Sequence, residues 1–519
     1  MRAWASVVAG LVLAACSVEV EGARCARPFA ADQCPAGQAC GNDHRCGARA
    51  AACAEPCCPD GTEGCAASAA TCGAAAVLRC DGADAVCGAW VALETCAAGR
   101  VCRDDAGAPA CLCPLAEGTL HADAAAGSAL GATPPPTGAA APIACRFQAL
   151  ADALDAAAVE ADGGAGVAVE ARGAFRTSLE ARPLVVAGGV TLRAAPDEVA
   201  SVEVDGPAAY GLLVAGGATV EDVTVRSAGA SAAGIGVDVA CADETPVTLA
   251  RVRVERGEGA GQLAAGVRVS APCTVASDAL HVSGAAAGLL LTETGTPASH
   301  AALTATGGSF TDCGRGVELQ AGRLVLSGTA ITDNEWEGVA STNSGRARQL
   351  TVDNARIKRN GDGGLVLDSN ERLDIQGTVV CGNEAVTPRD GVYEHRLVGG
   401  VVFMGDPPTE GNLVFRGNQI FANTGDQVMV ARAEDQWKLS GASSLADCPL
   451  HQNVFAGYVA PGRGVIAATA KVTATWNAWA SLAPSEGTDY EATGSGSTVD
   501  AGATGSQFCP RPSPLPSCD

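Results

Sequence analysis

Charged side chains that could bind a metal ion or a sugar acid recur between residues 353 and 374. The candidates are four aspartates and two of the arginines in this segment: Asp353, Arg356, Asp362, Asp368, Arg372 and Asp374. If they fall on successive repeats, the aspartates form a column of carboxylates beside arginine, which could hold a cation or a uronate sugar. Charges on exposed turns more commonly form a solvated outer face. The sequence leaves both interpretations open.

An aromatic side chain, Trp336 in the segment DNEWEG, is predicted to lie on a turn. It could stack on a sugar ring or cover the edge of a neighbouring repeat. Together with Asp353, Asp374, Arg356 and Arg372, it completes the set of candidate ligand-binding residues. No metal site and no cofactor is expected.

A repeat aligned on a leucine is the main indication of the fold. The leucines are Leu303, Leu324, Leu350, Leu373 and Leu413, separated by 21, 26, 23 and 40 residues. Four positions later come Gly307, Gly328, Asn354, Gly377 and Gly417, and ten positions later come Cys313, Asn334, Asn360, Asn383 and Asn423. Glycine-led strands such as GVEL, GVAS and GLVL follow. We expect the asparagines to stack into a ladder, with Cys313 in the place of one asparagine.

This repeat resembles the right-handed parallel β-helix of the pectin-lyase-like superfamily, over roughly residues 143–480. The helical spacing of Phe147, Leu150 and Leu154, followed by VAVEARGAF, resembles the start of such domains. The segment VTATWNAWA resembles their end. A leucine-rich repeat is the competing solenoid, but it needs a further leucine-spaced segment after the asparagine. The resemblance implies an all-β solenoid whose rungs stack about 4.8 Å apart.

Arg356-Ile357-Lys358 resembles a triplet in the active site of polygalacturonases. That family also carries an Asp-Asp pair and a Gly-His-Gly motif. Here adjacent aspartates occur only at Asp104-Asp105, and none of the six histidines lies between two glycines. Within the repeat, Ile357 takes the inward position held by Ile331 in the preceding copy. We therefore assign no catalytic residue.

The N-terminus and the net charge bear on location and partners. MRAWASVVAGLVLAACS has an apolar run too short to span a bilayer, and its end resembles a lipoprotein lipobox with Cys16 as the acylated residue. Because Ser17 follows, sorting to the outer membrane of a bacterial envelope is expected. The net charge of -23 disfavours nucleic acid and unaided adsorption to anionic lipid. The membrane is thus a partner only through the lipid.

Cysteine usage indicates an oxidising compartment and a separate N-terminal domain. Fifteen cysteines lie between Cys25 and Cys113, where the form Cys-x8-Cys-x-Ala-Gly-x-x-Cys occurs twice. No CxxC pair occurs, so disulfides are favoured over zinc. The predicted order is a signal peptide (1–15), a lipid-anchored tether (16–24), a small disulfide-rich irregular domain of duplicated modules (25–113), an Ala/Pro-rich structureless linker (114–142), the β-helix (143–480) and a tail (481–519).

Cysteines inside the β-helix test the predicted register. Cys241 and Cys273 follow glycine-led strands at nearly the same distance, so they should bridge adjacent rungs. Cys509 and Cys518, nine residues apart, are predicted to pair in the tail. Cys313 has an asparagine as its neighbour on the next rung and is the candidate for a buried free thiol.

These features favour a lipid-anchored surface protein whose β-helix acts in binding or structure, with a polysaccharide or a surface protein as partner. The alternative is a polysaccharide lyase or glycoside hydrolase acting on uronide glycans. A third possibility is that the cysteine-rich modules bind a protein and the β-helix is a spacer.

Overall fold

The computed structural model describes the backbone of seven short strands before residue 113 and, from residue 119 to residue 518, most of the chain. Within that range the gaps are 125–146, 162–165, 207–209, 230–233, 293–299, 342–347, 386–396, 458–461, 482–483, 503–507 and 513–517, and the single residues 148, 181, 271, 369, 410 and 511. The chain forms two compact units, residues 1–117 with 126–146, and residues 118–125 with 147–519. Cys16, the signal peptide, the tether and the disulfide connectivity of Cys25 to Cys113 lie outside the described residues.

The described strands of the first unit pair in antiparallel fashion, β1 with β2, β4 with both β3 and β5, and β6 with β7. They are β1 (Gln38–Cys40), β2 (Cys46–Ala48), β3 (Ala70–Gly73), β4 (Ala76–Asp81), β5 (Ala89–Thr95), β6 (Val101–Asp105) and β7 (Ala108–Leu112).

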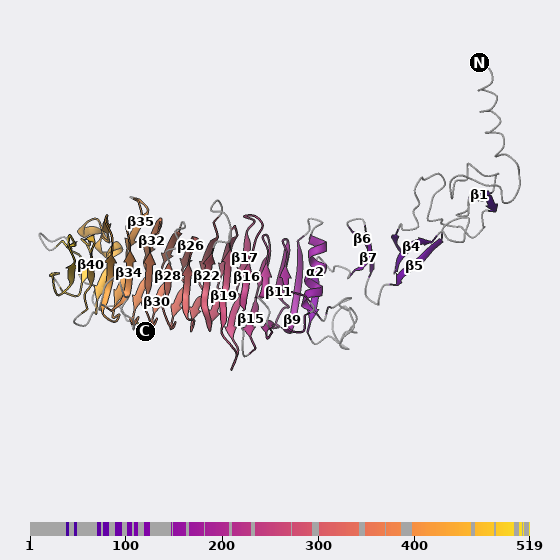
Figure 1. Ribbon diagram of the computed structural model, residues 1–519, viewed down its shortest axis with the longest axis horizontal. Coiled ribbons are helices and arrows are strands. Elements are labelled where there is room, and N and C mark those ends of the chain that lie inside the picture. Colours follow the sequence, from indigo (N-terminus) through magenta and orange to yellow (C-terminus); the bar gives the residue numbers. More distant parts are fainter. Residues whose placement is uncertain are drawn as a thin grey trace, which may run out of the picture. The chain divides into compact units, whose positions relative to one another are not determined.

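The second unit is a parallel β-helix, in which each strand pairs with the corresponding strands of the rungs before and after it (Figure 1). Sheet 1 contains β10 (Val185–Val186), β13 (Tyr210–Val214), β16 (Ile235–Val239), β19 (Leu263–Ser270), β22 (Ala285–Thr292), β25 (Arg315–Leu319), β28 (Val339–Ser341), β31 (Leu365–Asp368), β34 (Val398–Met404), β37 (Asp426–Ala431), β40 (Val465–Ala468) and β43 (Tyr490–Thr493).

Sheet 2 contains β8 (Thr119–Asp123), the first half of β9 (Val167–Arg176), β11 (Val190–Ala194), β14 (Thr219–Glu221), β17 (Val247–Ala250), β20 (Thr274–Asp278), β23 (Ala302–Thr306), β26 (Gly322–Ser327), β29 (Arg348–Asp353), β32 (Arg372–Gln376) and β35 (Leu413–Arg416). Toward the C-terminus a fourth sheet contains β38 (Gln436–Lys438), β41 (Lys471–Thr473) and β44 (Thr498–Asp500).

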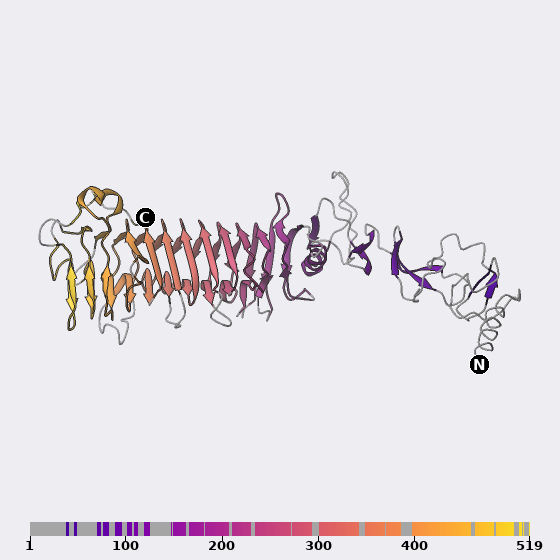
Figure 2. The same cartoon turned by 90° about the horizontal axis from the view of Figure 1, so that it is seen from above.

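Sheet 3 contains the second half of β9, then β12 (Ala200–Val204), β15 (Val223–Ser227), β18 (Arg253–Arg256), β21 (His281–Ser283), β24 (Ser309–Thr311), β27 (Ala330–Thr332), β30 (Arg356–Lys358), β33 (Val379–Cys381), β36 (Gln419–Phe421), β39 (Val454–Ala456) and β42 (Ala478–Trp479). Figure 2 shows the stack from above, with the short helices η2 (Leu445–Asp447) and α3 (Cys448–His451) beside the last rungs.

The leucine repeat marks the inward column of sheet 2. Leu303, Leu324, Leu350, Leu373 and Leu413 are direct register partners on consecutive strands. The first four are at most 1% exposed. One rung cannot bury such a side chain alone, so stacking creates the core. The predicted alignment is confirmed.

The repeated glycines bend the chain between sheets 2 and 3. Gly307, Gly328, Gly377 and Gly417 have φ between 57° and 68°, and Asn354 has φ 52°. This left-handed region disfavours most side chains but admits glycine and, less often, asparagine. The glycines of the glycine-led strands in sheet 1 serve close packing instead. A Cβ on Gly316 would lie 2.5 Å from the carbonyl oxygen of Gly338.

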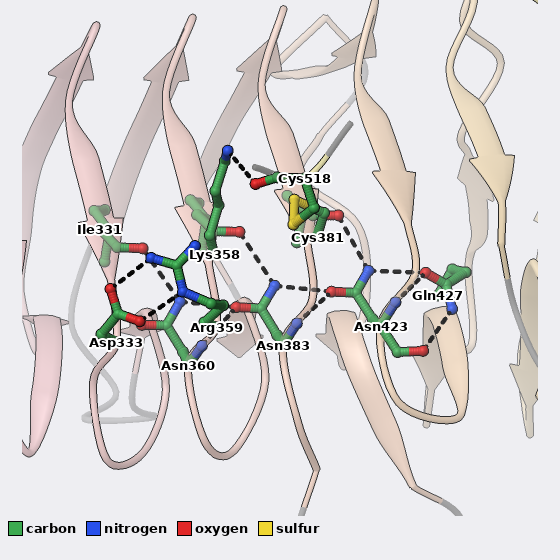
Figure 3. The surroundings of a disulfide bond; sticks show 12 residues. Ile331, Asp333, Lys358, Arg359, Asn360, Cys381, Asn383, Asn423, Gln427 and Cys518 are labelled. Atoms are coloured by element: carbon green, nitrogen blue, oxygen red, sulfur yellow. Dashed lines mark hydrogen bonds and ion pairs between the residues drawn. A yellow bond between two sulfur atoms is a disulfide. The ribbon is translucent and has the colours of Figure 1, made fainter. Parts of the chain in front are cut away.

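The predicted asparagine ladder lies at the corner between sheets 3 and 1 (Figure 3). The side-chain amides of Asn334, Asn360 and Asn383 each donate to the Oδ1 of the next ladder residue, at 2.7, 2.8 and 2.9 Å. Asn423 donates to Gln427 Oε1 at 2.8 Å, so a glutamine ends the ladder. At the other end, the backbone N–H of Cys313 donates to Asn334 Oδ1.

A second ladder, which the repeat alignment missed, lies at the corner between sheets 2 and 3. Asn418 and Asn453 each donate to the next Oδ1 at 3.0 Å, ending at Asn477. All three are 0% exposed. The segments GNQIF, QNVFA and WNAWA carry a common signal, an asparagine two positions before a buried apolar residue, but they occur only in the last rungs.

The first rung starts earlier than predicted. Thr119–Asp123 lies in the predicted linker, yet it pairs in parallel with β9, and Leu120 and Ala122 are buried. Two apolar residues are too few to indicate a strand until a partner is present. Helix α2 (Leu150–Ala161) packs against β8 to β11, and Glu180 accepts hydrogen bonds from the backbone N–H groups of Leu150 and Ala151.

The predicted tail was wrong in two respects. The strands β43 and β44 add a further rung, so parallel pairing continues to Asp500. Cys509 and Cys518 do not bond to each other. Cys518 pairs with Cys381 of β33, and Cys509 pairs with Cys448 of α3. The partners lie far away in the sequence, and the tail joins the outer face of sheet 3.

Two other cysteine predictions are confirmed. Cys241 and Cys273 form a disulfide with their Cα atoms 5.2 Å apart. Cys313 is a free thiol and is buried. Burial raises the pKa of this thiol to about 11.

Candidate functional site

The Arg356-Ile357-Lys358 triplet is strand β30 of sheet 3. Ile357 is 0% exposed and faces the core, in register with Ile331 and Val380. Arg356 is exposed, and Lys358 Nζ donates to the carbonyl oxygen of Cys518. The triplet is therefore an ordinary alternation of outward and inward side chains.

The predicted carboxylate column does not form. Asp353 and Asp374 lie on adjacent strands of sheet 2 but in different columns, since Asp353 pairs with Gln376 and Asp374 with Thr351. The other two aspartates lie elsewhere, Asp368 at the end of β31 in sheet 1 and Asp362 on a bridge to Ala385. The prediction failed because the chain passes through different sheets within each rung, and the spacing of the aspartates in the sequence does not show to which sheet each belongs.

Sheet 2 nevertheless brings three predicted residues onto one outer face, Asp353, Asp374 and Arg372. Gln376 donates to Asp374 at 2.5 Å and accepts a hydrogen bond from Arg416 at 2.8 Å. These bonds run along the surface and occupy one oxygen of the Asp374 carboxylate. In the part of the chain that the structure describes, no group of three or more His, Cys, Asp or Glu is placed to hold a metal ion.

Trp336 lies apart from that face, at the corner between sheets 3 and 1. Its backbone N–H donates to the Gly314 carbonyl, and its own carbonyl accepts from Asp362, so the turn is held by the rungs on both sides. The residue is 45% exposed, whereas Trp437 and Trp479 are 3% and 1% exposed. The Arg315 guanidinium lies 5.5 Å from the centre of the indole ring.

Two carboxylates hold Arg315 in place. Its Nε donates to Glu337 at 2.9 Å, and its NH1 group donates to Glu318 at 3.2 Å. Gln320 donates to Glu318 at 2.8 Å. Burial alone would lower the pKa of Arg315, but the hydrogen bond and charge of Glu337, together with Glu318, raise it above the ordinary value.

We call the group Trp336, Arg315, Glu337, Glu318 and Gln320 the tryptophan corner. It offers one exposed aromatic surface beside a fixed cation, carboxylate acceptors and an amide. An aromatic ring packs on the C–H groups of a sugar, and planar polar side chains bond its hydroxyls. Of the residues predicted to bind a ligand, the structure places only Trp336 in this group. Arg315 and Glu337 precede the glycine-led strands, a position that the repeat alignment did not single out.

The strand order and these sites define a parallel β-helix protein. No protein-family model matches the sequence, and no curated protein is significantly similar to it. Two solved structures are similar. The pectate lyase Pel9A has a TM-score of 0.31 at 12% identity, over 73% of this chain and 79% of the lyase. The Dettilon tailspike protein has a TM-score of 0.26 at 11% identity, over 69% of this chain and 64% of the tailspike. The fold is assigned from the strand pairing, because TM-scores and identities this low do not support a fold assignment.

Among the described residues no helix has the length and apolar character needed to cross a bilayer.

Proposed function

We propose that the chain is an extracytoplasmic, lipid-anchored protein whose β-helix binds a glycan at the tryptophan corner. The observation that carries the proposal is the exposed Trp336 ring beside Arg315, whose guanidinium is bonded to two carboxylates. An ion pair held in this way loses little conformational entropy when a ligand binds, so the corner is organised in advance.

Burial within the corner is graded, which suits recognition of a polar ligand. The Glu337 and Glu318 side chains are 7% and 13% exposed, while that of Arg315 is 32% exposed. The carboxylates therefore serve as support, and the ring and the guanidinium are the surfaces open to a ligand. A neutral glycan fits this corner best, because its cation Arg315 is already bonded to both Glu337 and Glu318, and the group as a whole carries a net negative charge.

The extracytoplasmic location is supported by cysteine chemistry. Three disulfides occur in the β-helix unit, and disulfides persist in oxidising compartments. Cys16 at the end of the apolar N-terminal run would carry the lipid. Replacing Cys16 by serine should move the protein from the membrane fraction to the soluble fraction, or block its maturation.

A glycan array probed with the purified protein, followed by titration of the best neutral glycan, tests the binding site. Trp336→Ala should weaken binding by at least about tenfold, as expected for a central aromatic contact. Trp336→Phe should retain part of the affinity. Leu179→Ala is the matched control, because Leu179 is also exposed and apolar but follows β9 in the first rungs, several rungs away from Trp336.

Equal affinity of the wild type and Trp336→Ala would exclude the corner as the binding site. Release of unsaturated or reducing uronide ends by the wild type would instead establish the alternative of a polysaccharide-cleaving enzyme.

A further inference from the structure

The outer face of sheet 3 changes character along the axis. In its first rungs the outward side chains form ion pairs between neighbouring strands, Arg176 with Glu203 at 3.0 Å and Arg226 with Glu255 at 2.6 Å. In its last rungs the outward side chains are apolar and belong to a buried cluster with the tail cysteines: Cys381, Phe421, Val454, Ala456, Ala478, Cys448, Cys509 and Cys518. Cys518 of the tail bonds Cys381 of β33, and Lys358 of β30 donates to the Cys518 carbonyl oxygen.

Between these two regions lies a strip of mostly short, hydroxyl-bearing side chains on β21, β24 and β27. We call it the hydroxyl strip, and it comprises His281, Ser283, Ser309, Thr311, Ala330 and Thr332. All six are partly exposed, while the alternate residues Val282, Phe310 and Ile331 are at most 1% exposed. None of the six side chains is a carboxylate, although the Thr311 hydroxyl donates to the neighbouring Asp312 at 3.3 Å. His281 Nδ1 and Ser309 Oγ are 2.9 Å apart, and Thr332 donates to Thr311 at 3.5 Å.

An exposed arginine stands at each end of the strip, in the same column. Arg253 is the register partner of His281, and Arg356 is the partner of Ala330. No carboxylate among the described residues forms an ion pair with either guanidinium. Other exposed arginines nearby are paired, Arg251 with Asp222 and Arg359 with Asp333, both at 2.7 Å.

The arginines of this column are therefore available to an external anion. Four rung intervals separate Arg253 from Arg356, a span of about 19 Å at the parallel-strand spacing. The net charge of -23 does not prevent this, because charges farther away than the Debye length of about 8 Å are largely screened at physiological salt.

We propose that the hydroxyl strip and its two arginines bind a linear anionic polysaccharide lying along the β-helix axis. Serine and threonine hydroxyls can donate to sugar hydroxyls and to carboxylate or sulfate oxygens, and guanidinium groups bond such anions in bidentate fashion. An extended sugar chain that lies parallel to the β-helix axis can contact the outward side chains of successive rungs. This proposal does not depend on Trp336, which lies at the corner between sheets 3 and 1 and is proposed to bind a neutral ligand.

The test uses the full-length protein and three polymers, dextran sulfate, polygalacturonate and uncharged dextran. We expect binding of at least one of the two anionic polymers at near-physiological salt, weakening as salt rises, and no binding of dextran. The double variant Arg253→Ala/Arg356→Ala should lose at least about tenfold in affinity for that polymer. A Thr311→Val/Thr332→Val variant, which keeps the charge and the shape, should also bind more weakly.

The matched control is Arg323→Ala/Arg416→Ala, which changes the net charge by the same amount on the outer face of sheet 2. This control should bind like the wild type. An equal loss in both double variants would mean that only net charge matters, and would overturn the proposal. Failure of both anionic polymers to bind, or equally tight binding of double-stranded DNA, would overturn it too. Loss of neutral-glycan binding in Trp336→Ala leaves these outcomes unchanged, so the two sites are tested separately.

Discussion

Replacing Asn360 by alanine should destabilise the β-helix through the loss of four side-chain hydrogen bonds at a position that is 0% exposed. The Oδ1 of Asn360 accepts from the backbone N–H and the side-chain amide of Asn334, at 3.2 and 2.7 Å. Its own amide donates to the Ile331 carbonyl at 3.2 Å and to Asn383 Oδ1 at 2.8 Å. In the variant, two buried donors of Asn334 lose their acceptor.

The magnitude follows from counting orphaned donors. A buried donor left without a partner costs about 1–3 kcal/mol, so two donors predict a loss of about 4 kcal/mol. In Asn334→Ala only one donor is orphaned, the backbone N–H of Cys313, because a cysteine has no side-chain amide. That variant should lose about 2 kcal/mol. Asn412 bonds Thr409 in an exposed turn, so Asn412→Ala should change stability by less than about 1 kcal/mol.

Urea unfolding followed by circular dichroism gives the three free energies, and hydrogen exchange localises the effect. The backbone N–H of Asn334 should lose protection from exchange in Asn360→Ala, and the backbone N–H of Cys313 should lose protection in Asn334→Ala. If Asn360→Ala and Asn334→Ala destabilise equally, the ladder does not act through paired acceptors, and the reasoning fails.

Three further predictions concern other parts of the fold. The Cys313 thiol should resist alkylation at about pH 8 in the folded protein and react after unfolding, as mass spectrometry can measure, because burial raises its pKa to about 11. Peptide mapping without reduction should recover Cys518 joined to Cys381; a Cys509–Cys518 peptide would contradict the structure. The hydrogen bond from Arg251 lowers the pKa of Asp222 in the folded state. Its contribution is therefore present above the unfolded pKa and lost as pH falls through the folded pKa, so Asp222→Asn should lower the unfolding midpoint at about pH 7 and have less effect at about pH 3.

The repeat could be predicted because its positions tolerate few residue types. A left-handed bend selects glycine or asparagine, and a buried ladder that bonds along the axis selects asparagine. Residues equivalent to Gly328 and Asn334 therefore mark each rung in which they occur. The inward leucine then shows which residues pair between strands of adjacent rungs. The Cys241–Cys273 bridge followed from the glycine-led strands that precede the two cysteines, since equivalent positions on adjacent rungs lie within disulfide range.

The candidate site was predicted less well, because outward residues obey no such restriction. Asp362 and Asp368 are close to Asp353 in the sequence, yet each lies beyond a different bend. Arg315 joins Trp336 only because one rung, a separation of 22 residues in the sequence, brings Glu337 beside Arg315. Sequence distance does not report which side chains share a face.

The sequence by itself determined the stacking unit, the inward columns, the first ladder and the free thiol at Cys313, all of which follow from local backbone geometry and from burial. Only the tertiary structure decided which rungs begin and end the β-helix, where the tail cysteines bond and which outward side chains meet. The strand β8 exists because β9 offers it an edge, and Cys518 reaches Cys381 across 137 residues because the tail joins the outer face of sheet 3. Contacts of this kind depend on the closure of long loops, whose outcome no local pattern encodes.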